Sequence, residues 1–152
     1  VCLLKMRGFS PEDFAKYHPG GSLGKRLYLR VDDVFDKEVR PYVSPDESIQ
    51  NTIINISQNR LGATVVLDGD DMLMGIITDG DVRRMVEKGQ PLDTLRAKDI
   101  MSRNPKVIER RELAVNAFSI MEKNKITSVV VLDEGKYVGL IHIHDVLREG
   151  IV

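Results

Sequence analysis

Two pairs of side chains have residue types and spacing that suit a site for a phosphate and a ribose. Thr78 lies three residues before Asp81, and His142 lies three residues before Asp145. Each pair directly follows an apolar run, so we expect a strand that ends where a helix begins. Free N–H groups at a helix start favour phosphate. A carboxylate there can accept hydrogen bonds from vicinal ribose hydroxyls.

Two interpretations of these pairs stay open. In a single copy, Thr78 and Asp79 could simply cap the helix that follows. The recurrence of the aspartate as Asp145 favours binding instead. His142 replaces the threonine in the second copy, and imidazole donates to phosphate better when it is protonated. We therefore expect two unequal sites, one of them weak or empty.

The strand that lies beside each pair could hold a base. The apolar and hydroxyl side chains suited to contact it are Ala63, Thr64 and Val65 in the first copy and Thr127, Ser128 and Val129 in the second.

The order His142, His144, Asp145 also resembles a metal cluster, since alternate residues of a strand point the same way. No third strong ligand lies nearby in the sequence. We therefore predict no metal site, and we expect no cofactor.

These pairs belong to a longer internal repeat. Residues 75–82 (GIITDGDV) recur 64 residues later as 139–146 (GLIHIHDV), and residues 59–68 (NRLGATVVLD) recur as 124–133 (NKITSVVVLD). Each copy reads helix, strand, hairpin, strand, helix, with a lead-in at 30–34 or 96–100. One copy of about 70 residues has a marginal core, so two should pack together. The expected fold is α/β (α+β), with two pseudo-symmetric β-hairpin and helix repeats packed through their sheets.

The helices have recognisable faces and ends. Ile49, Ile53 and Ile56 are spaced to form one apolar face. Residues 46–48 and 109–112 should supply caps and acidic first-turn residues. Gly89 and Gly150 should end the helices that follow the repeated phrases.

Composition narrows the function classes. The chain is 42% hydrophobic and 30% charged, with a net charge of −1 and both signs mixed. No basic stripe suggests nucleic acid, and no apolar run is long enough to span a membrane. Cys2 is the single cysteine, which suits a reducing compartment and predicts a cytoplasmic location. The start at Val1 suggests a piece of a longer polypeptide.

The doubled Gly-x-hydrophobic-Thr-x-x-Asp pattern, with the lead-in KDIMSRNP at 98–105, resembles the cystathionine-β-synthase (CBS) domain, which occurs in pairs. The resemblance implies a first repeat at 30–92 and a second at 93–152. It is informative about fold and weak about function, since this module accompanies enzymes, channels and transporters.

The residues before the first repeat are similar to a more specific family. The segment HPGGSLGKRL at 18–27 resembles the joint of arabinose-5-phosphate isomerases, in which a sugar-isomerase (SIS) domain precedes a CBS pair. The resemblance implies that residues 1–29 are the end of that domain with its linker. It also implies that His18 belongs to the isomerase site of the parent enzyme.

The implied parent interconverts ribulose 5-phosphate and arabinose 5-phosphate, a step that supplies the Kdo sugar of lipopolysaccharide. We expect this chain to lack catalysis of its own. It would bind a nucleotide or nucleotide-sugar, such as a CMP-linked sugar or an adenine nucleotide. It would also form a homodimer through its CBS pair, within a tetrameric parent. The alternatives are a generic adenine-nucleotide energy sensor and a dimerisation module with empty sites.

Overall fold

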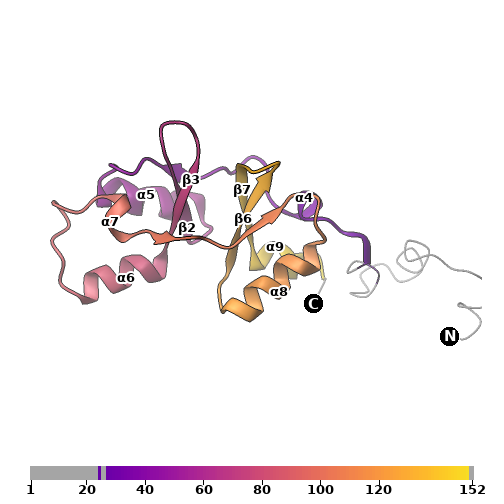
Figure 1. The fold of residues 1–152 in the computed structure, drawn as a ribbon. Coiled ribbons are helices and arrows are strands. Elements are labelled where there is room, and N and C mark those ends of the chain that lie inside the picture. Colours follow the sequence, from indigo (N-terminus) through magenta and orange to yellow (C-terminus); the bar gives the residue numbers. More distant parts are fainter. Residues whose placement is uncertain (1–23, 25–26, 151–152) are drawn as a thin grey trace, which may run out of the picture.

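Two similar lobes make up the computed structural model, which describes Gly24 and residues 27–150 (Figure 1). His18 and the rest of the expected SIS-domain segment lie outside the described residues, apart from Gly24 and residues 27–29. The elements of the first half are α4 (Val31–Val34), β1 (Tyr42–Val43), α5 (Ile49–Asn59), β2 (Ala63–Leu67), β3 (Leu73–Thr78) and α6 (Asp79–Glu87). Those of the second half are α7 (Ala97–Ile100), β4 (Ser102–Arg103), β5 (Val107–Glu109), α8 (Ala114–Asn124), β6 (Ser128–Asp133), β7 (Lys136–His142) and α9 (Ile143–Arg148).

Each lobe contains one sheet built around an antiparallel hairpin. The sheet orders are β1-β2-β3-β4 and β5-β6-β7, with β1 parallel to β2 and β5 parallel to β6. The registers correspond, since Val65 lies opposite Ile76 and Val130 lies opposite Leu140. Both hairpins have a register shift at the same place, after Val66 and after Val131. The repeat found in the sequence is therefore a repeat of strand pairing.

The two sheets pack against each other. Ala63, Val65 and Ile76 of the first sheet share one buried cluster with Val130 and Leu140 of the second. Every residue of β2 is buried, as expected for a strand covered on both faces. The predicted fold class, two repeats packed through their sheets, is confirmed.

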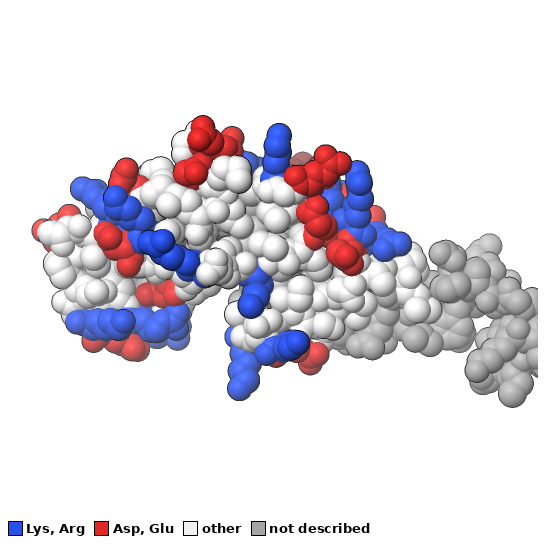
Figure 2. Space-filling model, in the orientation of Figure 1, with Lys and Arg blue, Asp and Glu red and all other residues white. Residues whose placement is uncertain are grey.

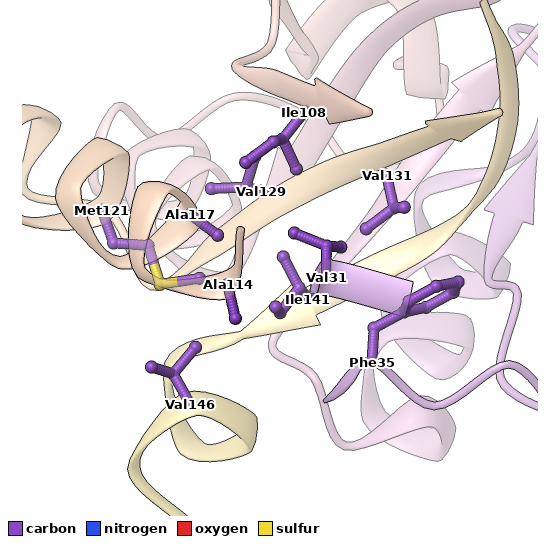
Figure 3. Close-up of a cluster of buried hydrophobic side chains, with 10 residues drawn as sticks. All are labelled: Val31, Phe35, Ile108, Ala114, Ala117, Met121, Val129, Val131, Ile141 and Val146. Atoms are coloured by element: carbon purple, nitrogen blue, oxygen red, sulfur yellow. The ribbon is translucent and has the colours of Figure 1, made fainter. Parts of the chain in front are cut away.

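Each lead-in segment packs on the other repeat rather than on the repeat that directly follows it in sequence. In Figure 1, α4 lies in the lobe of β6 and β7, and α7 lies in the lobe of β2 and β3. Figure 3 shows Val31 and Phe35 among the buried side chains of the second repeat, beside Ile141. Ala97 of α7 is buried with Ile77 of the first repeat. The packing units therefore exchange their lead-ins.

This exchange explains the two glycines that open the repeated phrases. A Cβ on Gly75 would lie 2.7 Å from the carbonyl oxygen of Ser102, and a Cβ on Gly139 would lie 2.9 Å from the Phe35 ring. Both distances are shorter than a van der Waals contact allows. The glycines are required because the exchanged lead-in approaches the strand backbone closely.

The ends of the helices agree with the sequence in part. The Ser48 side chain accepts a hydrogen bond from the Asn51 N–H at 3.1 Å and caps α5. Gly89 and Gly150, just beyond α6 and α9, have φ of +67° and +70°, as glycines that end helices do. The expected cap of α8 at 109–112 is wrong, because α8 begins after Leu113 without a side-chain cap.

The apolar face expected for α5 also needs a correction. Ile49 and Ile56 are buried, but Ile53 is 37% exposed, and Thr52 takes the third buried position. The Thr52 hydroxyl remains satisfied because it donates to the Ser48 carbonyl oxygen at 2.8 Å. In the part of the chain that the structure describes, no helix is long and apolar enough to cross a membrane.

Candidate functional site

The first repeated pair forms a reciprocal cap at the start of α6. The Asp81 N–H donates to Thr78 Oγ1 at 3.2 Å, and the Thr78 N–H donates to Asp81 Oδ2 at 2.9 Å. This is the capping box, which satisfies backbone donors that a helix start leaves free. The capping interpretation is therefore realised in the first repeat, although it does not by itself exclude a bound ligand.

Asp81 makes three further contacts. Thr78 Oγ1 lies 3.1 Å from Oδ2, while Arg84 and the Ser102 hydroxyl donate to Oδ1 at 2.6 and 3.1 Å. Ser102 comes from the exchanged lead-in, so Asp81 ties that segment to α6. A carboxylate has about four acceptor positions, and the side chain is only 8% exposed. A ribose hydroxyl would have to replace one of these donors.

The second pair has the same arrangement with fewer contacts. The His142 N–H donates to Asp145 Oδ2 at 2.8 Å, and Arg148 donates to Oδ1 at 2.5 Å. The described residues supply no equivalent of the Ser102 contact in the hydrogen bonds of Asp145. Asp145 consequently retains acceptor positions that Asp81 has used.

His142 caps α9 through its ring. The His144 N–H donates to His142 Nδ1 at 3.0 Å, and the two rings stack with centroids 4.7 Å apart. Because Nδ1 accepts, neutral His142 carries its proton on Nε2 and can still donate from that atom. Burial lowers the pKa of His142, the charge of His144 lowers it further, and Asp145 opposes both. Protonation of Nδ1 would break the cap, so the two roles of the ring compete.

One cavity lies between the repeats beside Asp81, and we name it the first cleft. Its volume is about 660 Å³. Five of the predicted ligand-binding residues line it: Thr78, Asp81, Thr127, Ser128 and His142. Residues 102–106, which include β4 and follow α7, form one side of it. The pseudo-symmetric partner repeats thus contribute polar groups to a single cavity.

A second cavity occupies the pseudo-equivalent position beside Asp145, and we name it the second cleft. Its volume is about 920 Å³, and residues 38–41, 58–61 and Arg148 are among those that line it. His142 lies in the wall of the first cleft and not in that of the second. The sequence pairs His142 with Asp145, but their side chains serve different cavities.

The residues predicted to hold a base are not near either cleft surface, apart from Thr127 and Ser128. Ala63, Thr64, Val65 and Val129 are at most 1% exposed, and they line neither cleft. Among the residues that the structure describes, the buried Thr64 hydroxyl has no hydrogen-bond partner. We infer that these four residues act as core residues in this conformation.

The sequence analysis missed several residues that line the two clefts. Arg84 and Arg148 follow their aspartates at the same interval, which is a signal the repeat contains. Ser102 gives no local signal, because its contact with Asp81 joins residues far apart in sequence. The same holds for the basic residues of the cleft wall, Arg83, Arg103, Lys106 and Lys125. Within the described ranges, no three His, Cys, Asp or Glu side chains are grouped as metal ligands would be.

Comparison with known proteins identifies the family. The CBS domain model matches this chain twice, over residues 31–88 and 97–151. The arabinose 5-phosphate isomerase KdsD of Yersinia pestis is 42% identical over 153 residues, which cover 100% of this chain and 47% of the relative. The chain thus spans about half the length of the curated relatives that it matches. The predicted resemblance to CBS pairs of these isomerases is confirmed.

Solved structures share the fold. A conserved protein from Pyrococcus horikoshii superimposes with a TM-score of 0.71 at 25% identity, covering 79% of this chain and 90% of that one. A CBS domain protein from Pyrobaculum aerophilum, solved in complex with AMP, has a TM-score of 0.70 at 22% identity and covers 77% and 89%. With two family matches that span most of its length, this chain belongs to the CBS-domain family as a tandem pair.

Proposed function

We propose that this chain is the ligand-sensing CBS pair of an arabinose 5-phosphate isomerase and binds a nucleotide or nucleotide-sugar in the first cleft. The observation that carries the proposal is the composition of the cleft wall. Hydroxyl, imidazole and basic side chains from both repeats converge on one cavity of about 660 Å³, a volume suited to a small organic ligand. A ligand held there would contact both repeats at once.

The polar groups of this wall have chemistry suited to a nucleotide. Thr127 and Ser128 carry hydroxyls, and neutral His142 offers a donor at Nε2. The start of α6 adds a partial positive charge that favours phosphate. Asp81 would accept from a ribose only after it releases Ser102 or Arg84.

The second cleft is a weaker candidate for a nucleotide. Asp145 has free acceptor positions for sugar hydroxyls, but the wall there contains the carboxylates of Asp36 and Glu38. These negative charges would oppose a phosphate. One occupied and one weaker site is the arrangement that the sequence analysis predicted, and it remains a proposal.

The relationship to arabinose 5-phosphate isomerases indicates which activity ligand binding would regulate. The parent protein would interconvert ribulose 5-phosphate and arabinose 5-phosphate, with His18 in its active site, and ligand binding here would adjust that activity. The AMP complex of the Pyrobaculum relative supports an adenine nucleotide as one candidate. A CMP-linked sugar, which would report on the downstream product, is the other.

Isothermal titration calorimetry tests the binding step. AMP, ADP, ATP, CMP and a CMP-linked sugar would each be titrated into this chain and into Thr127→Val, which removes a wall hydroxyl while nearly preserving shape. We expect at least one nucleotide to bind, with affinity reduced about fivefold or more in the variant, as loss of one hydrogen bond implies. Absence of binding by all five compounds would refute the proposal.

Ser102 provides a sharper test of the ribose contact. Ser102→Ala frees one acceptor position on Asp81. If Asp81 holds ribose hydroxyls, the variant should bind the ribonucleotide more tightly than the wild-type chain does, and the 2′-deoxy analogue should not gain. Equal changes for both analogues would show that Asp81 is a cap and not a ribose acceptor.

We also propose that two copies associate through their helices. Ile53 of α5, Val86 of α6 and Leu147 of α9 are 37%, 60% and 46% exposed. A second copy could cover such apolar side chains in a closed two-fold dimer. Sedimentation equilibrium at tens of micromolar (about the range in which modest interfaces assemble) should give a dimer, and a pure monomer would contradict the proposal.

A further inference from the structure

The two clefts differ in charge far more than their pseudo-symmetry suggests. Five basic residues line the first cleft, against the two carboxylates of Asp79 and Asp81. In the second cleft, three basic residues face three carboxylates. The first cleft is therefore cationic and the second is balanced.

Most of the cations of the first cleft lack a partner. Arg84 is held by Asp81 at 2.6 Å. Arg83, Arg103, Lys106 and Lys125 form no ion pair or hydrogen bond through their side chains with other described residues. Figure 2 shows basic side chains on both sides of the notch between the lobes. All four side chains are solvent-exposed, so water screens their mutual repulsion, and a bound anion would interact favourably with all of them.

In the second cleft, two of the three basic side chains have contacts within the protein. Arg148 bonds Asp145 at 2.5 Å, and Arg40 donates to the Tyr137 carbonyl oxygen at 3.3 Å while it lies over the Tyr42 and Tyr137 rings. Only Arg60 is left without such a contact in that wall. This difference between the two clefts suggests that the four unpaired cations of the first cleft contact a bound anion.

The number and placement of the cations indicate how much negative charge that counterpart carries. Arg83 lies on α6, Arg103 lies on β4, Lys106 directly precedes β5, and Lys125 directly follows α8. A terminal phosphate monoester carries about −2 at neutral pH, which balances about half of this set. A chain of two or three phosphates carries more charge and reaches further along the cavity.

We infer that the first cleft selects a nucleoside diphosphate or triphosphate over the monophosphate, with Arg103 and Lys106 contacting the outer phosphates. This inference rests on the proposed function and narrows its ligand. It also predicts that occupancy is confined to one cleft per chain, because the second cleft offers no comparable charge.

Titration of AMP, ADP and ATP into three forms of the chain tests the inference. The forms are the wild type, Arg103→Gln with Lys106→Gln, and Arg60→Gln as the matched removal of a cation from the second cleft. We expect ADP and ATP to bind the wild type about tenfold more tightly than AMP, with one site per chain, since hydrogen bonds to charged groups are the strong ones. The double variant should bind all three nucleotides equally, and Arg60→Gln should behave as wild type.

A salt series and a phosphate chain without a nucleoside distinguish failure of this inference from failure of the proposed function. Raising NaCl from 50 to 300 mM should weaken ATP more than AMP, because exposed cations are screened. Equal affinity for the three nucleotides would overturn the inference and leave the proposed function standing. Binding of inorganic tripolyphosphate without binding of AMP, ADP or ATP would indicate a site for a polyanion and overturn the inference. Binding of none of these compounds would overturn the inference, and the proposed function would then be decided by the titrations of CMP and the CMP-linked sugar.

Discussion

Replacing Asp81 by Ala should destabilise the fold more than replacing Asp145 by Ala. Both substitutions leave the N–H of Thr78 or His142 without its carboxylate acceptor, at about 1–3 kcal/mol when buried, while the cap made by the Thr78 or His142 side chain remains. Their arginine partners, Arg84 and Arg148, are 62% and 71% exposed, so those ion pairs contribute only about 0–1 kcal/mol each.

The difference comes from the contacts that only Asp81 makes. Its carboxylate also accepts from Ser102 Oγ and lies within hydrogen-bond distance of Thr78 Oγ1. A typical hydrogen bond contributes about 0.5–1.5 kcal/mol, so Asp81→Ala should lose about 1–2 kcal/mol more than Asp145→Ala.

Urea denaturation of the whole chain, followed by circular dichroism, measures both values. A double-mutant cycle between Asp81→Ala and Ser102→Ala should give a coupling of about 0.5–1.5 kcal/mol. If Asp145→Ala costs as much as Asp81→Ala, or if the cycle shows no coupling, the exchanged lead-in is not held by this contact.

Three further changes have defined outcomes. Gly75→Ala should cost about 1–3 kcal/mol in urea denaturation, since its Cβ would meet the Ser102 carbonyl oxygen at 2.7 Å; a cost near zero would contradict the close approach. Tyr137→Phe should cost about 1–2 kcal/mol, because its buried hydroxyl donates to the Pro41 carbonyl oxygen at 2.6 Å, and an unchanged urea midpoint would argue against this bond. His142→Thr should remove a dependence of the free energy of unfolding on pH. Burial lowers the pKa of the His142 imidazole in the folded chain. The unfolded chain therefore binds a proton at higher pH than the folded chain does, and the wild type loses stability as pH falls through about 6.5. The variant keeps a capping hydroxyl without this titration, and equal shifts of both urea midpoints between pH 7.5 and 5.5 would refute the assignment.

The repeat made most of the fold predictable. Two copies of one phrase at a fixed offset identify the hairpins, and the glycines at 89 and 150 identify helix ends through a local backbone requirement. Such features depend on residues close in sequence. The prediction for Ile53 was wrong because a spacing of four residues is compatible with more than one buried helix face. In the packed structure, Thr52 is buried and Ile53 is not.

The exchange of lead-ins could not be derived in the same way. Residues 30–34 and 96–100 read alike, and nothing in their own pattern says which repeat they cover. The exchange also affects the site, since it brings the Ser102 hydroxyl to Asp81. The sequence also could not show that His142 lines the cleft beside Asp81 rather than the one beside Asp145, because that depends on how the two sheets pack together.

The repeated aspartates now support a different conclusion from the one that their recurrence first suggested. Each makes a capping box with the residue three positions before it, and a cap is needed wherever this helix begins, whether or not a ligand binds. Their repetition is therefore explained by folding alone. Folding does not explain why unpaired cations and hydroxyls from both repeats line the first cleft and have no counterpart of similar number in the second. These cations are solvent-exposed, so folding does not require partners for them, but their concentration in one cleft, and not the symmetry between the aspartates, is the stronger argument for the proposed anionic ligand.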